Sequence, residues 1–168
     1  MDGDTTGADE WFAHAIERYR ESYPLAPPGS WGRPIAILKA RILAGDWSGA
    51  EADAAWTLDE GAAESDSPIG LYAAALALLV LGRDQEARAP ADTLRTGAAF
   101  PAPVGDALAF LAAGDPIGYI EAIERVLESF EGREDYLEDL PVADTVIVLQ
   151  ALAARRGLAA ELSSPLLP

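Results

Sequence analysis

Apolar positions along the chain recur with helical spacing, and three of the helical runs end in the same kind of corner. Each corner has two apolar residues, a glycine and a polar residue: Leu43-Ala44-Gly45-Asp46, Val80-Leu81-Gly82-Arg83 and Ala112-Ala113-Gly114-Asp115. The three glycines are 37 and then 32 residues apart. A recurrence in this range is typical of stacked helical hairpins, in which each hairpin buries its apolar face on a neighbour. The pattern therefore predicts an all-α fold of antiparallel helical hairpins.

The runs between the corners predict seven or eight helices in a single domain of residues 1–168. The expected helices cover residues 9–23, 33–43, 47–61, 69–81, 84–96, 104–113, 116–131 and 141–156. Residues 1–8 are expected to form an N-terminal tail, and residues 158–168 a C-terminal tail that packs back through Leu166 and Leu167. The run 69–81 is apolar almost all round, so we expect it to be the most buried helix, with Leu76 and Leu79 fully inside.

Helix boundaries follow from capping residues and prolines. Thr6 and Asp46 are predicted N-caps, and Asp139 with Gly157 is expected to bound the last helix. Pro90 is expected to kink the fifth helix or delay its start. Two apolar stripes are expected to face the core: Trp11, Phe12, Ala15, Ile16, Tyr19 and Tyr23 on the first helix, and Ile117, Ile120, Ile123, Leu127 and Phe130 on the seventh.

The corner spacing resembles that of tetratricopeptide repeats, in which a small residue and a Gly-polar corner join paired helices. The offsets after each corner differ from one another, and the proline that usually closes a unit is missing. The resemblance implies a short tetratricopeptide-like α-solenoid, an architecture that binds partners over extended surfaces.

Charge and composition narrow the classes of partner. The 168 residues include no Cys and one His, and the formal net charge is −16. Thiol chemistry and thiolate metal sites are therefore excluded, and nucleic acid or an anionic membrane surface is disfavoured. A basic protein partner is the natural expectation, although the acidity could serve solubility alone.

Composition also bears on the location and the source of the chain. The sequence shows neither a secretory signal at Met1–Glu10 nor an apolar run of membrane-spanning length, so we expect a cytoplasmic protein. Abundant Ala, Gly and Pro, with Arg in place of Lys, resemble proteins from GC-rich actinobacterial genomes.

The densest charge run lies between Glu128 and Asp139, and like charges this close repel one another. One interpretation is a docking patch for a basic partner, with the apolar pair Tyr136 and Leu137 at its centre. The other is a solvated helix end and loop whose acidic residues stabilise the N-terminus of the next helix. The predicted partner-binding residues are Glu128, Glu131, Glu134, Asp135, Tyr136, Glu138 and Asp139.

Two smaller clusters could carry chemistry. His14 shares a helical face with Glu10 and Glu17, an arrangement that could contribute to a carboxylate metal site, but a simple surface histidine is the plainer interpretation. A second acidic patch consists of Asp59, Glu60, Glu64 and Asp66, which could act as general acids or bases only if burial shifted their pKa values. Since neither cluster shows a specific motif, we predict no catalytic residue, metal or cofactor.

Two stretches of the chain carry a family resemblance. They are the region Trp31–Trp56 and the C-terminal residues Tyr136, Asp144-Thr145, Ala153-Ala154-Arg155-Arg156-Gly157-Leu158 and Ser164-Pro165-Leu166-Leu167-Pro168. They resemble immunity protein 49 of bacterial polymorphic-toxin systems. The resemblance implies a stoichiometric inhibitor that binds a toxin domain and is not an enzyme. The alternatives are a general tetratricopeptide-like adaptor and, in a different class, an enzyme with a carboxylate metal site; the oligomeric state stays open.

Overall fold

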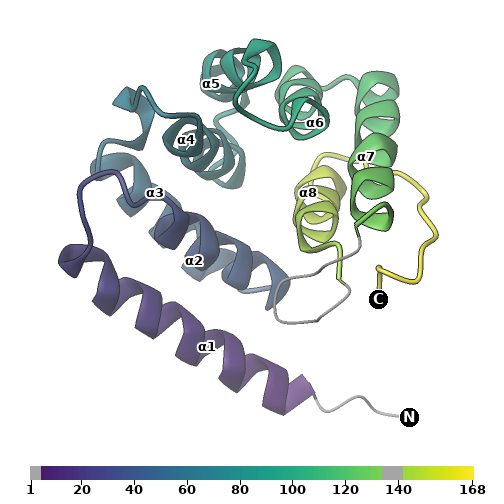
Figure 1. Ribbon diagram of the computed structural model, residues 1–168. Helices are drawn as coiled ribbons and strands as arrows, with labels where there is room; N and C mark the ends of the chain where they lie inside the picture. The colour runs from purple at the N-terminus through teal and green to yellow at the C-terminus, as the bar shows by residue number, and fades with distance from the viewer. Residues whose placement is uncertain (1–4, 134–141) are drawn as a thin grey trace. The chain divides into compact units, whose positions relative to one another are not determined.

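The computed structural model describes residues 5–133 and 142–168, and the regular structure in these residues is helical throughout (Figure 1). The helices are α1 (Thr5–Ser22), α2 (Gly32–Leu43), α3 (Trp47–Asp59), α4 (Pro68–Val80), α5 (Asp84–Thr96), α6 (Ala102–Ala113), α7 (Pro116–Glu131) and α8 (Asp144–Ala154), with short 3₁₀ segments at Tyr23–Leu25 and Ala62–Glu64. The predicted all-α class is confirmed.

The chain divides into two compact units, one ending at Arg83 and the other beginning at Asp84. In the first unit α2 packs against α1, α3 and α4, and α3 also packs against α4. In the second unit α6 packs against α5, α7 and α8, and α7 also packs against α8. Helices that are neighbours in sequence are therefore neighbours in space within each unit, as stacked hairpins require.

Each unit has a glycine corner after its second and its fourth helix. Gly45, Gly82 and Gly114 have φ of 69°, 68° and 69°, so each predicted corner is made by a glycine in the left-handed conformation. In each corner the glycine N–H donates to a carbonyl three residues back, and the next N–H donates to a carbonyl five residues back. This is the Schellman pattern, which satisfies the last carbonyls of a helix. Gly157 repeats it with φ of 68° and is the fourth corner.

Replacing Gly114 by alanine is expected to destabilise the protein by about 1 kcal/mol, because its Cβ would meet open space and only the left-handed backbone is strained. Urea unfolding of the full chain measures this. Gly132→Ala is the matched control at the other end of α7, because Gly132 has φ of −81°. Equal losses in both variants would show that backbone strain is not the cause.

Asp46 and Asp115 follow two of these corners and cap the next helices. The Asp46 carboxylate accepts from the N–H of Gly49 at 2.9 Å, which confirms the predicted cap. Asp115 accepts from the N–H groups of Ile117 and Gly118, both at 3.1 Å. The Gly49 N–H bond, reinforced by Arg41, lowers the pKa of Asp46 although partial burial acts the other way.

The glycines three residues after these caps allow close packing. A Cβ on Gly118 would lie 2.5 Å from the Phe110 ring, and one on Gly49 would lie 2.8 Å from the Arg41 guanidinium. Gly-Asp-x-x-Gly therefore recurs at 45–49 and 114–118 for a packing reason as well as a capping one.

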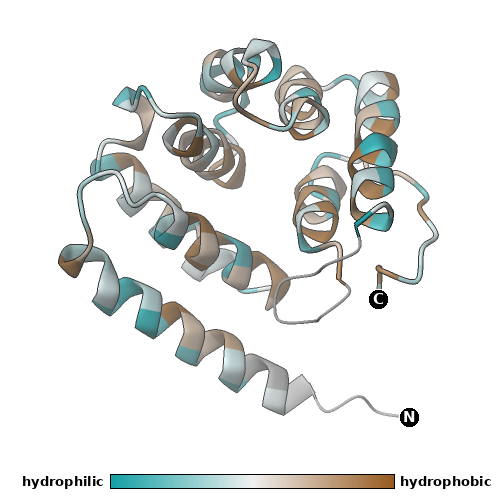
Figure 2. Cartoon of the chain, viewed as in Figure 1, coloured by the Kyte–Doolittle hydropathy of each residue, from teal (hydrophilic) through white to brown (hydrophobic). Residues whose placement is uncertain are grey.

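Helix α4 is the most uniformly buried helix, as the sequence predicts. Every residue from Tyr72 to Val80 is buried, and Leu76 and Leu79 have no more than 1% of their surface exposed. Figure 2 shows the apolar colouring of α4 along most of its length. Such a helix gains stability from burial on all sides.

The first predicted helix is wrong in its start and in part of its buried stripe. Helix α1 already begins at Thr5, so Thr6 does not cap it and residues 5–8 of the expected tail belong to the helix. Ile16 and Phe12 pack in the core, but Trp11 is 77% exposed and Tyr19 is also exposed. The apolar stripe is wider than the face that α1 turns toward α2, so its edge remains in solvent.

Helix α5 covers the expected residues, Asp84 to Thr96, and Pro90 lies inside it, so of the two effects expected of Pro90 the late start is wrong. Helix α8 begins at Asp144 after an N-cap at Ala143, three residues later than expected. Asp139, the predicted cap, lies outside the described residues.

The C-terminal tail packs against the rest of the second unit through Leu166, whereas Leu167, the other expected contact, is only half-buried. Leu166 is buried, and its carbonyl accepts the N–H of Ala143 at 3.0 Å. Gln150 exchanges two hydrogen bonds with the backbone of Ala160, donating at 2.6 Å and accepting at 3.1 Å. At the end of α8, Arg156 forms a two-pronged ion pair with Asp84 at the start of α5.

Candidate protein-binding surface

The outward side of α7 carries an exposed row of apolar and acidic side chains. Ile117 is 71% exposed and Ile120 is 38% exposed, so the predicted core stripe of this helix is wrong at these two positions. The buried side is formed by Tyr119, Ala122, Ile123, Val126, Leu127 and Phe130. The exposed side also includes Arg125 and Ser129, and we give the name α7 face to six of its residues: Ile117, Ile120, Glu121, Glu124, Glu128 and Glu131.

Helical geometry places these six residues on one side of α7, which is 16 residues long. Ile120 and Glu121 are adjacent, and the other neighbouring members are three or four residues apart, so the six side chains form a stripe along the helix. The isoleucines lie in its first half and most of the carboxylates in its second half. The α7 face therefore joins an apolar end to an acidic end.

Only part of the predicted docking patch belongs to this surface. Glu128 and Glu131 are exposed on the last turns of α7, and the Glu131 carboxylate accepts from the Ser164 hydroxyl at 2.7 Å. The remaining predicted residues, Glu134, Asp135, Tyr136, Glu138 and Asp139, lie outside the described residues. Sequence reasoning missed Glu121 and Glu124 as members because it treated the run from Glu128 onward as separate from the outer side of the helix.

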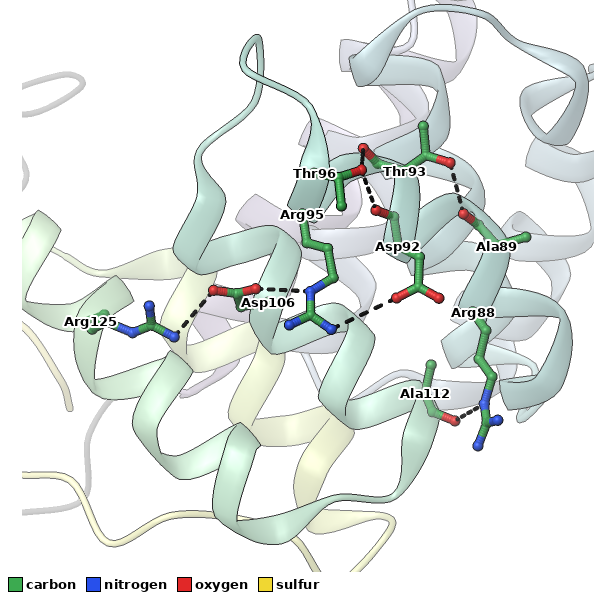
Figure 3. A network of polar contacts seen from close by, with 9 residues as sticks. All are labelled: Arg88, Ala89, Asp92, Thr93, Arg95, Thr96, Asp106, Ala112 and Arg125. Atoms are coloured by element: carbon green, nitrogen blue, oxygen red, sulfur yellow. Dashed lines mark hydrogen bonds and ion pairs between the residues drawn. The ribbon is translucent and has the colours of Figure 1, made fainter.

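An ion-pair network fixes α7 to the helices before it (Figure 3). Asp106 on α6 accepts from Arg95 on α5 at 3.0 Å and from Arg125 on α7 at 3.2 Å. Arg95 also lies near Asp92, at 3.9 Å, and over the ring of Phe110. One carboxylate thus joins three helices, which holds the α7 face in a defined register.

Tyr119 fixes α7 from its buried side. Its hydroxyl donates to the side chain of Gln150 on α8 at 2.9 Å, and burial raises the pKa of this phenol. Because Gln150 also binds the backbone of Ala160, the same polar group links α7, α8 and the C-terminal tail.

The first unit has a similar carboxylate at the centre of three helices. Asp53 on α3 is 5% exposed and accepts from Arg20 on α1 and Arg41 on α2, both at 2.9 Å. Burial alone would lower the pKa of Arg41, but the carboxylates of Asp53 and Asp46 raise it. Sequence reasoning missed Asp53, although its position among Ala50, Ala54 and Thr57 on the buried side of α3 is the signal that could have found it.

The His14 cluster lies along a groove rather than in a metal site. Glu10, His14 and Glu17 share one face of α1, as the spacing predicts, and they line a pocket of about 710 Å³. Among residues 5–133 and 142–168, no three His, Cys, Asp or Glu side chains are placed to hold a metal ion.

The second acidic patch is an exposed surface. Asp59, Glu60, Glu64 and Asp66 are all exposed, and Glu60 accepts from the indole N–H of Trp56 at 3.0 Å. The burial that the acid–base hypothesis requires is therefore missing at these four side chains.

Comparison with known proteins gives this chain no relative: no family model, curated protein or solved structure matches it. The resemblance to immunity protein 49 therefore stays a prediction. Within the described part of the chain, no helix has the length and apolarity that crossing a membrane requires.

Proposed function

We propose that this protein is a non-catalytic binding module that docks a basic protein partner on the α7 face, in an immunity-type role. The observation that carries the proposal is the line of exposed isoleucines and glutamates on α7. Exposed isoleucines beside carboxylates offer an apolar contact with a charged surround, which is the composition of many protein interfaces. The carboxylates attract a basic surface over long range and orient it before contact.

The architecture around the α7 face supports this role. Asp106 and Tyr119 hold the helix on both sides, so binding would order few additional groups and would lose little conformational entropy. The chain as a whole also attracts a basic partner, because its formal net charge is −16. A basic toxin whose substrate-binding surface becomes covered by the α7 face is the partner that the immunity-type proposal favours.

Reversing Glu124 and Glu128 to lysine is expected to lower the association rate of the partner at least tenfold at low salt and to leave stability nearly unchanged. Both side chains are exposed, and they are four residues apart on α7. Because both become lysine, the pair still carries like charges, and the repulsion within the helix is unchanged. The partner is first captured on the tagged full chain and identified by mass spectrometry, and stopped-flow association is then measured at several salt concentrations. The wild-type rate should fall as salt rises, because screening weakens steering.

The matched control is Glu64→Lys with Asp66→Lys, which changes the net charge equally in the second acidic patch. If the control slows association and the α7 variant does not, the docking surface lies in that patch. Ile117→Ala should instead raise the dissociation rate about tenfold, equivalent to about 1.4 kcal/mol. An immunity-type role further requires that the partner lose its activity at a one-to-one ratio, and an adaptor would leave that activity intact.

A further inference from the structure

A groove in the first unit, distinct from the α7 face, follows one side of α1. It consists of the pocket of about 710 Å³ and an adjoining pocket of about 460 Å³, which share Glu10 and His14 in their walls. The larger pocket also contacts Glu17, Glu21, Arg20, Arg41 and Asp53, and the smaller one contacts Gly7 and Trp11. We call this feature the α1 groove.

The wall formed by α1 is a row of carboxylates. Glu10, Glu17 and Glu21 are separated by seven and four residues, so they lie on one side of the helix over about 16 Å. None of the three forms an ion pair with a described residue. They present negative charge to the groove and have no ion-pair partner in the part of the chain that the structure describes.

The two arginines of the groove, Arg20 on α1 and Arg41 on α2, do not neutralise this row. Arg20 and Arg41 direct their guanidinium groups to Asp53, and Arg41 also pairs with Asp46 at 2.6 Å. These two cations are therefore engaged by two other carboxylates. The groove consequently favours a cationic ligand group.

An exposed indole adds a second preference. Trp11 borders the smaller pocket beside Glu10, and it is the most exposed aromatic side chain among those described. Guanidinium groups stack on indole rings while donating to carboxylates. The same unit already contains this arrangement, because the guanidinium of Arg20 lies 3.9 Å from the ring centre of Trp56 while it donates to Asp53.

We propose that the α1 groove binds arginine side chains of an extended basic segment in a protein partner. Trp11 stacks on one guanidinium, and Glu10, Glu17 and Glu21 accept hydrogen bonds from that and following arginines. Lysine fits less well, because an ammonium group is a point charge that cannot stack as a plane. The site does not depend on the α7 face being a docking surface.

The test titrates a hexa-arginine peptide into the full chain and follows binding by calorimetry at moderate salt. Trp11→Ala and Glu17→Gln are each expected to weaken binding about threefold to fivefold, the effect of losing one exposed cation–π contact or one charged hydrogen bond. Trp11→Phe should retain most of the affinity, since it keeps an aromatic face. Hexa-lysine should bind more weakly than hexa-arginine.

Two control variants separate this site from general attraction to an acidic protein. Tyr19→Ala removes another exposed aromatic of α1, and Asp66→Asn removes another exposed carboxylate of the same unit; neither residue lines the groove. Both should change the affinity less than twofold. Equal losses in controls and groove variants, equal binding of hexa-lysine, or free arginine binding as tightly as the peptide would each overturn the proposal.

Discussion

Replacing Leu76 by alanine is expected to lower the free energy of unfolding by about 2–5 kcal/mol, measured by chemical denaturation. Leu76 has no exposed surface and sits in a run of nine consecutive buried residues on α4. The lost methyl groups leave a cavity that a helix enclosed on all sides cannot refill by moving. A large part of the stability of an average domain would be lost with this one side chain.

The same substitution at Leu25 provides the control. Leu25 is 86% exposed, so Leu25→Ala should change the free energy of unfolding by less than about 0.5 kcal/mol. A loss below about 1 kcal/mol for Leu76→Ala would show that α4 is not the centre of its unit.

Replacing Gly105 by alanine should destabilise the protein by at least about 1–3 kcal/mol, the range for overpacking. A Cβ at this position of α6 would lie 2.7 Å from the backbone nitrogen of Arg95 and 2.8 Å from its Cα. The obstacle is backbone, so α5 and α6 must separate, and this would strain the bond from Arg95 to Asp106 as well. Urea unfolding measures the loss.

Gly32→Ala is the matched control for this variant. Gly32 lies in the first turn of α2, and a Cβ there meets nothing within 4 Å. Alanine is the better helix former by up to about 1 kcal/mol, so this variant should be unchanged or more stable. If Gly105→Ala were equally stable, the close approach of α5 and α6 would be in doubt.

The sequence predicts features that depend on a few adjacent residues. Helix α7 begins where expected because Asp115 caps it and Pro116 occupies its first position, and it ends at Glu131, also as expected, with Gly132 as its C-cap. The glycine corners are predictable for the same reason, since a left-handed residue after a helix strongly favours glycine. The full burial of α4 also follows from local composition.

Features that depend on the direction of a neighbouring helix were not predictable. The apolar arc of α7 extends from Ile117 to Phe130, and periodicity cannot tell which edge meets α6 and α8. The structure buries Tyr119 and Val126 and leaves Ile117 and Ile120 exposed, which creates the α7 face. Asp53 and Asp106 likewise gain their roles only from arginines on other helices.

The ion pair between Arg156 and Asp84 has a kinetic consequence. It joins residues 72 positions apart, so most of the second unit forms the loop that it closes. Closing such a loop before the helices have docked is entropically unfavourable, so we expect the pair to form after the transition state for folding. An interaction absent from the transition state slows unfolding and leaves the folding rate almost unchanged. This pair thus acts on the lifetime of the native state more than on the speed at which it forms.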